Sequence, residues 1–395
     1  MEIEKLIRFN SWWTSKLVRA ELLIHNKRPL YNKLLDYMKD RQILLIYGLR
    51  RVGKTSLLYQ LIQELLNTGI KETSILYFSF DEQLISLDDL IKTYEEKVLK
   101  KSLNSEKIYI FLDEIQKSGD WENKIKIYYD LFPNIKFIIS GSASVHIKKK
   151  MKESLAGRIY DFMLEPLSFE EFLKLKNIKV DKKQINLYNR EILPVFYDYL
   201  MKGGFPEITN EENEEKIKNY VRNSVIDKIL YQDIPSEFKL KDYDLLRTIL
   251  ERVASNPGMI INFETLSKEL QRNKNTIMAY FYYLDYALLL RFLANYRGKF
   301  SISSRKLKKV YLTNTAISFA FADQINDKLQ EKIFENYAII SSNAKNYYRN
   351  KIEVDIILKI NNKIIPVEVK HGKIEEDSLI YFLNEFSIKE GIILT

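Results

Sequence analysis

The sequence Gly48-Leu49-Arg50-Arg51-Val52-Gly53-Lys54-Thr55 matches the pattern G-x-x-x-x-G-K-[ST] at every fixed position. The segments on either side of it have the strand and helix patterns that such a loop requires. Residues 42–47 are apolar enough for a buried parallel strand, and residues 56–66 are apolar at helical spacing. A surface loop that matches by chance would not need these neighbours. A strand, a glycine-rich turn and a helix in this order predict a loop that surrounds phosphate groups.

The loop has residue types that suit a nucleotide bound together with Mg²⁺. Glycine at positions 48 and 53 lets backbone N–H groups converge on one anion, and the helix N-terminus adds partial positive charge. Lys54 can reach the β- and γ-phosphates, and the Thr55 hydroxyl can bind Mg²⁺. We therefore expect ATP and Mg²⁺ as cofactors. The residues expected to contact them are Gly48, Arg50, Arg51, Val52, Gly53, Lys54, Thr55 and Ser56.

Composition excludes several classes of protein. A chain of 395 residues is expected to form two to four domains, and 46% hydrophobic with 29% charged residues is typical of folded proteins. The absence of cysteine excludes disulfides, zinc–thiolate sites and cysteine catalysis. No apolar run is long enough to span a bilayer and no signal-peptide core is present, so a cytoplasmic protein away from membranes is expected. The net charge of +9 permits a polyanionic partner without requiring one.

Three further segments read as strands: residues 74–80, 107–112 and 136–140. Helical patterns at 87–99 and 121–131 separate them, so a parallel α/β sheet is predicted. Because the carboxyl ends of parallel strands meet at one edge of a sheet, polar residues that follow these strands should gather beside the phosphate loop.

The pair Asp113-Glu114 closes the second of these strands. We expect Asp113 to hold Mg²⁺ and Glu114 to act as the base that activates water for attack on the γ-phosphate. Simple transfer of a phosphoryl group to a small substrate does not need the second carboxylate, so the pair favours hydrolysis. The alternative is a charged strand end that faces solvent.

Two further positions are candidates for the same site. Ser142 is the first choice, and Ser140 the second, for a side chain that contacts the attacking water or the γ-phosphate. The alternative is an ordinary loop serine. Arg158 is a candidate arginine finger or nucleotide sensor, acting in its own chain or in a second copy, and the alternative is a surface arginine.

Six motifs, in order and spacing, resemble one family of proteins. They are GLRRVGKTSLL, IFLDEIQ, FIISGSAS, AGR, LEPLSFEEF and GGFPE, the last at Gly203 to Glu207. The sequence resembles archaeal and bacterial P-loop ATPases of the AAA-like branch that carry a C-terminal restriction-endonuclease-like domain. The resemblance implies an ATPase core with five core strands and an all-helical lid from Pro166 to about Ile234.

The next segment has the pattern of a winged helix. Two short helices, at 263–270 and 276–286, are followed by strand-like residues at 289–294 and 310–312. Four residues would lie at the start of the recognition helix, namely Asn273, Lys274, Asn275 and Thr276. Five basic residues would line the wing, namely Lys299, Arg305, Lys306, Lys308 and Lys309. The alternative is a protein–protein adaptor whose lysines form a solvated face.

The C-terminal segment shows the D…ExK pattern of restriction-endonuclease-like nucleases. Asp355 lies on one predicted strand, Glu368 and Lys370 lie on the next, and Glu335 lies on the preceding helix. The three carboxylates are candidate Mg²⁺ ligands at a scissile phosphate, and Lys370 would orient the water or stabilise developing charge. The alternative is a remnant fold that binds without cutting.

These expectations give an α/β protein with four parts. They are a P-loop ATPase core (1–165), a helical lid (166–235), a winged-helix domain (236–315) and a small α/β nuclease-like domain (316–395). The expected function is a Mg²⁺-dependent ATPase that acts on or with DNA through the last two parts. The alternative is a nucleotide-dependent switch that controls a protein partner and has an inactive nuclease-like domain. A homo-oligomer is compatible with both, and a small-molecule kinase is disfavoured by Glu114 and the appended parts.

Overall fold

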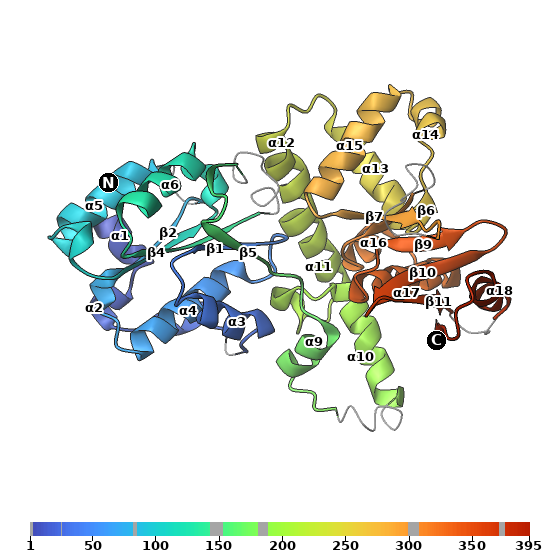
Figure 1. Ribbon diagram of the computed structural model, residues 1–395, viewed down its shortest axis with the longest axis horizontal. Helices are drawn as coiled ribbons and strands as arrows, with labels where there is room; N and C mark the ends of the chain where they lie inside the picture. The colour runs from blue at the N-terminus through green and yellow to red at the C-terminus, as the bar shows by residue number, and fades with distance from the viewer. Residues whose placement is uncertain are drawn as a thin grey trace. The chain divides into compact units, whose positions relative to one another are not determined.

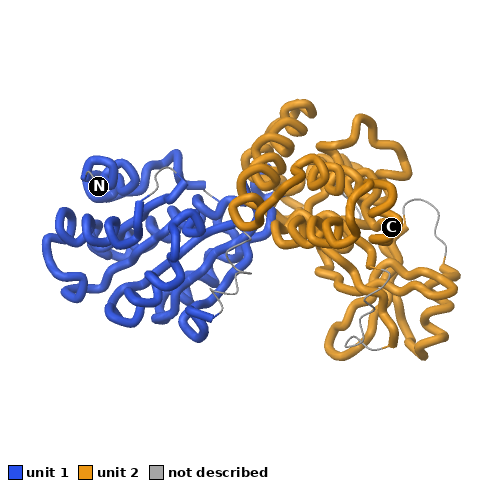
Figure 2. The backbone as a smooth tube through the Cα atoms, turned by 90° about the horizontal axis from the view of Figure 1, so that it is seen from above, with its two compact units in different colours: residues 1–166, 173–177 blue, residues 167–172, 178–395 orange. Residues whose placement is uncertain are grey.

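The computed structural model divides the chain into two compact units (Figure 2). Unit 1 comprises residues 1–166 and 173–177, and unit 2 comprises residues 167–172 and 178–395. The residues that the structure describes are 3–24, 26–81, 85–142, 153–180, 189–298, 308–370 and 376–395. Among the helices in these ranges, none is long and apolar enough to cross a lipid bilayer.

Unit 1 contains a five-stranded sheet in the order β2-β3-β4-β1-β5, and every neighbouring pair is parallel. The strands are β1 (Ile43–Tyr47), β2 (Ile75–Ser79), β3 (Ile108–Asp113), β4 (Ile135–Gly141) and β5 (Ile159–Met163). The predicted parallel α/β sheet is confirmed. The carboxyl ends of β1, β3 and β4 lie at one edge of this sheet, which is the edge that carries ligand sites in open α/β folds.

Helices cover both faces of this sheet (Figure 1). The helices of unit 1 are α1 (Ile3–Phe9), α2 (Trp12–Ser15), α3 (Pro29–Tyr37), α4 (Lys54–Asn67), α5 (Leu87–Tyr94) and α6 (Trp121–Leu131). The α5 and α6 helices cover one face, and α3 and α4 cover the other.

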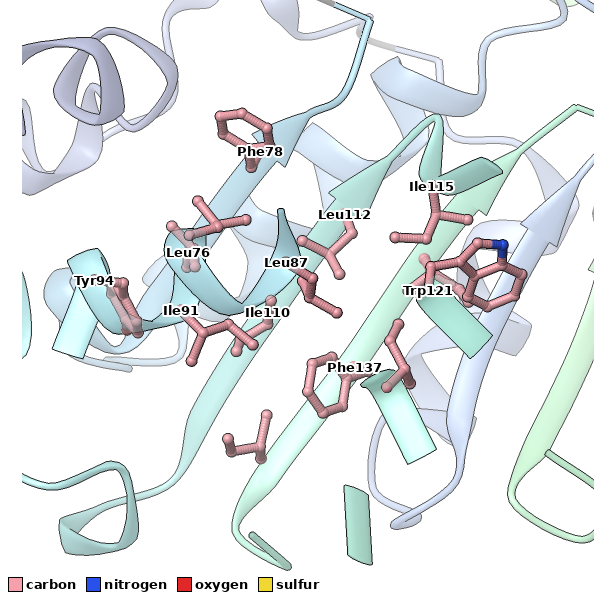
Figure 3. Close-up of a cluster of buried hydrophobic side chains, with 14 of the residues drawn as sticks. Leu76, Phe78, Leu87, Ile91, Tyr94, Ile110, Leu112, Ile115, Trp121 and Phe137 are labelled. Atoms are coloured by element: carbon pink, nitrogen blue, oxygen red, sulfur yellow. The ribbon is translucent and has the colours of Figure 1, made fainter. Parts of the chain in front are cut away.

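The core on the α5 and α6 face is built from alternate strand residues (Figure 3). Leu112 and Phe137 from the strands pack in one cluster with Leu87 and Trp121 from the helices, and each is at most 1% exposed. Burial of each such side chain contributes about 1.5–3 kcal/mol to the stability of the unit.

The N-terminal segment covers the outer edge of β2. Asn10 pairs with the backbone of Tyr77, since its Oδ1 accepts from the Tyr77 N–H at 2.7 Å and its Nδ2 donates to the Tyr77 carbonyl at 2.9 Å. The indole N–H groups of Trp12 and Trp13 both donate to the Ile75 carbonyl, at 3.1 and 2.9 Å. The edge strand therefore has partners for backbone groups that would otherwise be open, and Tyr77 is held in place.

Unit 2 begins with helices and turns, and residues 167–235 contain no strand within the part that the structure describes. The helices of unit 2 are α9 (Phe169–Leu175, whose C-terminal part belongs to unit 1), α10 (Asn189–Lys202), α11 (Glu214–Asn219), α12 (Ile234–Glu237), α13 (Tyr243–Ser255), α14 (Phe263–Glu269), α15 (Lys274–Tyr286), α16 (Ala316–Phe321), α17 (Asp327–Ser341) and α18 (Asp377–Glu385). Two π-helical segments, Tyr220–Ile226 and Ile229–Asp233, follow α11. Gly204 has a φ of +70°, and a Cβ there would collide with the Leu167 carbonyl, so the turn before Pro206 requires glycine.

One sheet of seven strands runs through the rest of unit 2, in the order β12-β11-β10-β9-β7-β8-β6. The strands are β6 (Met259–Ile260), β7 (Leu290–Asn295), β8 (Lys309–Leu312), β9 (Asn346–Arg349), β10 (Glu353–Ile360), β11 (Lys363–Val369) and β12 (Ile392–Leu394). Parallel pairing of β7 with β9 carries the sheet across the boundary predicted at residue 315. Tyr311, Ile339 and Tyr347, from both sides of that boundary, share one core and are fully buried. The division into a winged-helix part and a nuclease-like part stays a prediction.

Candidate functional site

The loop of residues 48–53 joins β1 to α4 and leaves the start of that helix open. Gly53 is the N-cap, with φ +98° and ψ +23°, and no side chain caps the helix. A Cβ on Gly48 would collide with the Leu164 carbonyl, so only glycine lets the loop pass so close to the chain after β5. The first N–H groups of α4 are therefore placed to bind an anion.

Lys54 is buried in this loop, with 5% of the residue exposed. Its Nζ donates to the carbonyl oxygens of Gly48 at 3.2 Å and Leu49 at 2.9 Å. These partners are neutral, so the charge of the ammonium group is not compensated by them. A phosphate oxygen is a stronger partner for a buried ammonium group than a carbonyl oxygen is.

Asp113 collects three hydroxyl groups at the carboxyl end of β3. Thr55 donates to its Oδ2 at 2.6 Å, Tyr77 donates to the same oxygen at 3.1 Å, and Ser140 donates to Oδ1. Burial and the neighbouring Glu114 raise the pKa of Asp113, whereas hydrogen bonds from Ser140 and Thr55 and the charge of Lys54 lower it. The Thr55 hydroxyl and the Asp113 carboxylate are oxygen donors of the kind that Mg²⁺ prefers, and they already lie together.

Glu114 has a left-handed backbone, with φ +53° and ψ +45°. Such a conformation costs a non-glycine residue about 1–2 kcal/mol and is found mainly where the surrounding structure imposes it. The Glu114 Oε2 accepts from Gln116 Nε2 at 2.6 Å, and the Glu114 N–H donates to Asp113 Oδ1 at 3.1 Å. The turn thus places two carboxylates side by side and fixes the second one through Gln116.

The serine candidates lie at the carboxyl end of β4, whereas the arginine candidate lies elsewhere in unit 1. Ser140, the second choice, donates to Asp113, and Ser142 is buried directly after β4. Contact of either serine with the attacking water or the γ-phosphate stays a prediction. Arg158 precedes β5 and forms a two-point ion pair with Asp130, at 2.9 and 3.1 Å. It lies at the amino end of its strand, whereas the phosphate loop follows the carboxyl end of β1, and the two strands are parallel. Arg158 is therefore not at the phosphate loop of its own chain, and a role in a second copy stays a prediction.

Tyr77 and Gln116 are contacts that the sequence did not identify. A tyrosine within the otherwise apolar strand β2 is a signal that its hydroxyl needs a buried partner, and that partner is Asp113. The register aligns Ser79 with Asp113 across β2 and β3, which brings the two strand ends together. No sequence signal singles out Gln116.

The nuclease-like residues come from four places in unit 2. Glu335 lies on α17, Asp355 on β10, Glu368 on β11, and Lys370 directly after β11. Glu368 is 4% exposed; its Oε1 accepts from Lys370 Nζ at 2.8 Å, and its buried Oε2 has no hydrogen-bond partner among the described residues. The Asp355 Oδ2 accepts from the Val369 N–H at 3.0 Å.

Lys309 on β8 lies among these carboxylates. Its Nζ is 2.6 Å from Glu353, 3.1 Å from Glu335 and 3.9 Å from Asp355, and only 5% of its side chain is exposed. Burial alone would lower the pKa of Lys309, but the three carboxylates raise it above its usual value. The expectation that Lys309 lines an exposed wing is therefore wrong, because it neutralises a buried acidic cluster.

Burial is the main reason that the pKa of Asp355 rises to about 8, and Glu335 and Glu368 add to the effect. Tyr311 also donates to the Glu335 carboxylate. Among the described residues, no group of three or more histidine, cysteine, aspartate or glutamate side chains has the arrangement of a metal site. The Mg²⁺ assignment to Glu335, Asp355 and Glu368 stays a prediction, and Lys309 is the cation found among them.

The predicted recognition helix, α15, starts at the surface. Asn273, Lys274 and Asn275 are exposed, and Lys274 pairs with Glu264 at 2.8 Å. Of the predicted wing residues, Lys308 is exposed. Three others, Lys299, Arg305 and Lys306, lie outside the residues that the structure describes. Thr276 is partly buried at the first turn of α15.

Comparison with protein families matches residues 40–173 to a family described as AAA domain. This range includes the phosphate loop, Asp113 and Glu114. Residues 194–328 match a second family, described as a domain of unknown function. The N-terminal part of the chain is thus similar to AAA domains over the range that contains its phosphate loop.

Individual relatives extend over both units. Two proteins of Methanocaldococcus jannaschii, described as uncharacterized proteins MJ1544 and MJ1637, are 29% identical over 382 residues (91% of this chain, 83% of the relative) and 27% identical over 438 residues (98% and 90%). Among solved structures, the Walker-type ATPase PABY2304 of Pyrococcus abyssi has a TM-score of 0.46 at 16% identity and covers 77% of this chain and 97% of that one. The Aeropyrum pernix ORC1 protein in complex with DNA has a TM-score of 0.36 at 11% identity, with 79% and 96% coverage.

The pKa of Asp355 predicts a pH-dependent stability for unit 2. An unfolded aspartate ionises near pH 3.9, whereas Asp355 in the folded protein ionises near pH 8. Below both pKa values Asp355 is protonated in the folded and the unfolded state, so it does not change the free energy of unfolding with pH. As pH rises between them the unfolded state gains charge first, so the free energy of unfolding falls until it levels off above pH 8.

We expect Asp355→Asn to flatten this decline, because the amide does not titrate and its oxygen still accepts from the Val369 N–H. The free energy of unfolding in urea, measured from pH 4 to 9 in metal-free buffer, checks this. Asp244→Asn, an exposed change of the same chemistry, serves as the control. Parallel pH profiles for Asp355→Asn and the parent protein would contradict the expectation.

Proposed function

We propose that unit 1 hydrolyses ATP in a Mg²⁺-dependent reaction. The observation that supports this best is the buried Asp113 carboxylate, which accepts from Thr55 at 2.6 Å while Glu114 follows it in a left-handed turn. The hydrogen bond from Thr55 to Asp113 joins the first turn of α4, where phosphates would bind, to the carboxylate pair at the same edge of the sheet. Asp113 is buried, which a charged strand end that faces solvent would not be.

Each residue has a definite task in this proposal. The N–H groups at the start of α4 bind the phosphates, and Lys54 exchanges its carbonyl partners for the β- and γ-phosphate oxygens. Thr55 and Asp113 would hold Mg²⁺, which neutralises phosphate charge when bound. Glu114 accepts the proton of the attacking water, and Gln116 keeps its carboxylate oriented. Ser140 and Tyr77 keep the Asp113 carboxylate fixed.

We further propose that this activity is used with DNA. The exposed asparagine and lysine side chains at the start of α15, together with exposed Lys308, are of the types that contact phosphates and base edges. Lys309, buried among carboxylates, takes no part.

A second candidate function is a nucleotide-dependent switch that controls a protein partner. One observation favours it: Met278 and Tyr282, one helical turn apart on α15, are 44% and 52% exposed. In addition, the basic residues near the helix start are paired, Arg272 with Asp242 at 2.9 Å and Lys274 with Glu264 at 2.8 Å. An apolar strip beside neutralised charges fits a protein surface better than a phosphate backbone.

For the ATPase we expect Lys54→Ala to weaken ATP binding, because it removes the charge that meets the phosphates.

Glu114→Gln should keep ATP binding and lower kcat by about 10²–10⁴-fold, because the base is lost while the metal site remains. Calorimetric titration gives the affinity, and phosphate release gives the rate. Lys39→Ala and Glu96→Gln, exposed changes of the same kinds in unit 1, are the controls. Parental turnover in Glu114→Gln would refute the role of Glu114.

The two candidate uses of the ATPase are separated by one comparison. If DNA is the partner, duplex DNA should raise the ATPase rate, the effect should weaken steeply with salt, and Lys308→Glu should reduce it, with Lys359→Glu as the exposed control. If a protein is the partner, DNA should leave the rate unchanged, and Met278→Ser with Tyr282→Ser should remove capture of a partner without changing basal turnover. A rate that DNA does not change at low salt would sink the DNA proposal.

A further inference from the structure

Unit 2 contains a large polar pocket that the ATPase proposal does not use. It has a volume of about 1090 Å³ and is formed by α13, the π-helical segment before it at Tyr220–Ile226, and the chain from the end of α16 to α17. This volume exceeds what a small-molecule site needs, which is about 300–1,000 Å³. All of its lining residues belong to unit 2.

The lining is strongly basic. It includes five cationic side chains, Arg222, Arg247, Arg252, Lys328 and Lys332, and two acidic ones, Glu251 and Asp323. A concave site lined mainly by one sign of charge focuses the field and raises the local concentration of the opposite ion.

Two of the five cations are neutralised within the fold. Arg247 pairs with Glu251 at 2.8 Å and with Asp227 at 3.3 Å, and Arg252 pairs with Glu269. Arg247 also lies 5.7 Å from the centre of the Phe321 ring. These pairs hold the wall of the pocket in shape and leave little charge for a ligand.

The other three cations form no ion pair among the described residues, and their hydrogen-bond partners are neutral. Arg222 donates from Nε to the Ala320 carbonyl, Lys332 donates to the Asn256 side chain, and Lys328 is exposed at the rim with no ion pair. Burial and the nearby charges of Lys328 and Lys309 lower the pKa of Lys332, although Glu335 opposes this. The pocket therefore holds more positive charge than its ion pairs neutralise, although Asp323 in the lining and Glu335 near Lys332 offset part of it.

We propose that this pocket binds phosphate groups, with Arg222, Lys328 and Lys332 as the side chains that contact them. Guanidinium and ammonium groups from separate elements suit an anion with several oxygens, and Asn256 supplies an amide that can donate as well. The shared chemistry fits two sources: the phosphodiester backbone of a nucleic acid, and a free nucleotide or pyrophosphate.

A neighbouring hollow favours the phosphodiester backbone. A second pocket of about 470 Å³ shares Asn256 and Lys332 with the first and is also lined by Lys309, Glu335 and Glu353. Because the two hollows share lining residues they adjoin each other, and a linear polyanion can extend from one into the other where a compact ligand cannot. Asn273–Asn275 on α15 line neither hollow, so this site stands independently of the DNA contact proposed above.

The test is a binding comparison between matched double variants of the full chain. Lys328→Gln with Lys332→Gln removes two of the proposed contacts, and Lys359→Gln with Lys363→Gln removes the same charge from the exposed β10–β11 hairpin. One arm uses fluorescence anisotropy of labelled single-stranded and duplex oligonucleotides. The other arm uses calorimetry of pyrophosphate and of ATP, with Lys54→Ala present in every protein so that the phosphate loop does not contribute.

We expect the pocket variant to bind at least about tenfold more weakly than the control variant in one arm, with a shallower dependence on salt. Loss in the oligonucleotide arm identifies a nucleic-acid backbone, and loss only in the calorimetric arm identifies a free phosphate compound. Equal affinities of the two variants in both arms, or no binding by the parent chain, would overturn the proposal. If the double variant does not fold, the single variant Lys328→Gln, at an exposed position, replaces it in the comparison. ATP hydrolysis by a chain with intact Lys54 is measured separately, so that failure of the proposed ATPase activity of unit 1 can be told apart from failure of this proposal.

Discussion

The hydrogen bond from Thr55 to Asp113 is the interaction on which the site of unit 1 depends. It links the first turn of α4 to the carboxyl end of β3, although the two residues are 58 positions apart. A buried carboxylate is costly unless donors satisfy it, and here Ser140 and Tyr77 complete the set. The hydrogen bond between Asn10 and the backbone of Tyr77 also supports this site, because it holds in place the strand β2 that carries Tyr77.

Much of this site was predictable because its signals are local. The phosphate loop, the strand before it and the Asp113-Glu114 pair are contiguous patterns, and parallel strand order brings their ends together. The contact of Ser140 with Asp113 was not predictable, because it depends on the register of β3 and β4. Arg158 lies away from the phosphate loop of its own chain for a topological reason, because it precedes β5, which runs parallel to β1, whereas the loop follows β1. The sequence motif alone did not show at which end of the strand Arg158 would lie.

Unit 2 shows where sequence patterns are least informative. The run of basic residues that ends at Lys309 reads as one solvated wing, but pairing of β8 within a seven-stranded sheet turns Lys309 inward toward Glu335, Glu353 and Asp355. That sheet depends on the pairing of β7 with β9, which no local pattern signals. Unit 2 thus holds two kinds of lysine: Lys309, compensated by carboxylates, and Lys332, whose contact with Asn256 is neutral.

The central claim is that Asp113 and Thr55 organise a Mg²⁺–nucleotide site, and metal-linked affinity tests it most directly. A non-hydrolysable ATP analogue is titrated into the parent protein and Asp113→Asn, each with and without Mg²⁺. We expect Mg²⁺ to tighten binding by the parent at least about tenfold, and Asp113→Asn to keep the metal-free affinity while losing most of that gain. An equal gain from Mg²⁺ in both proteins would contradict the claim.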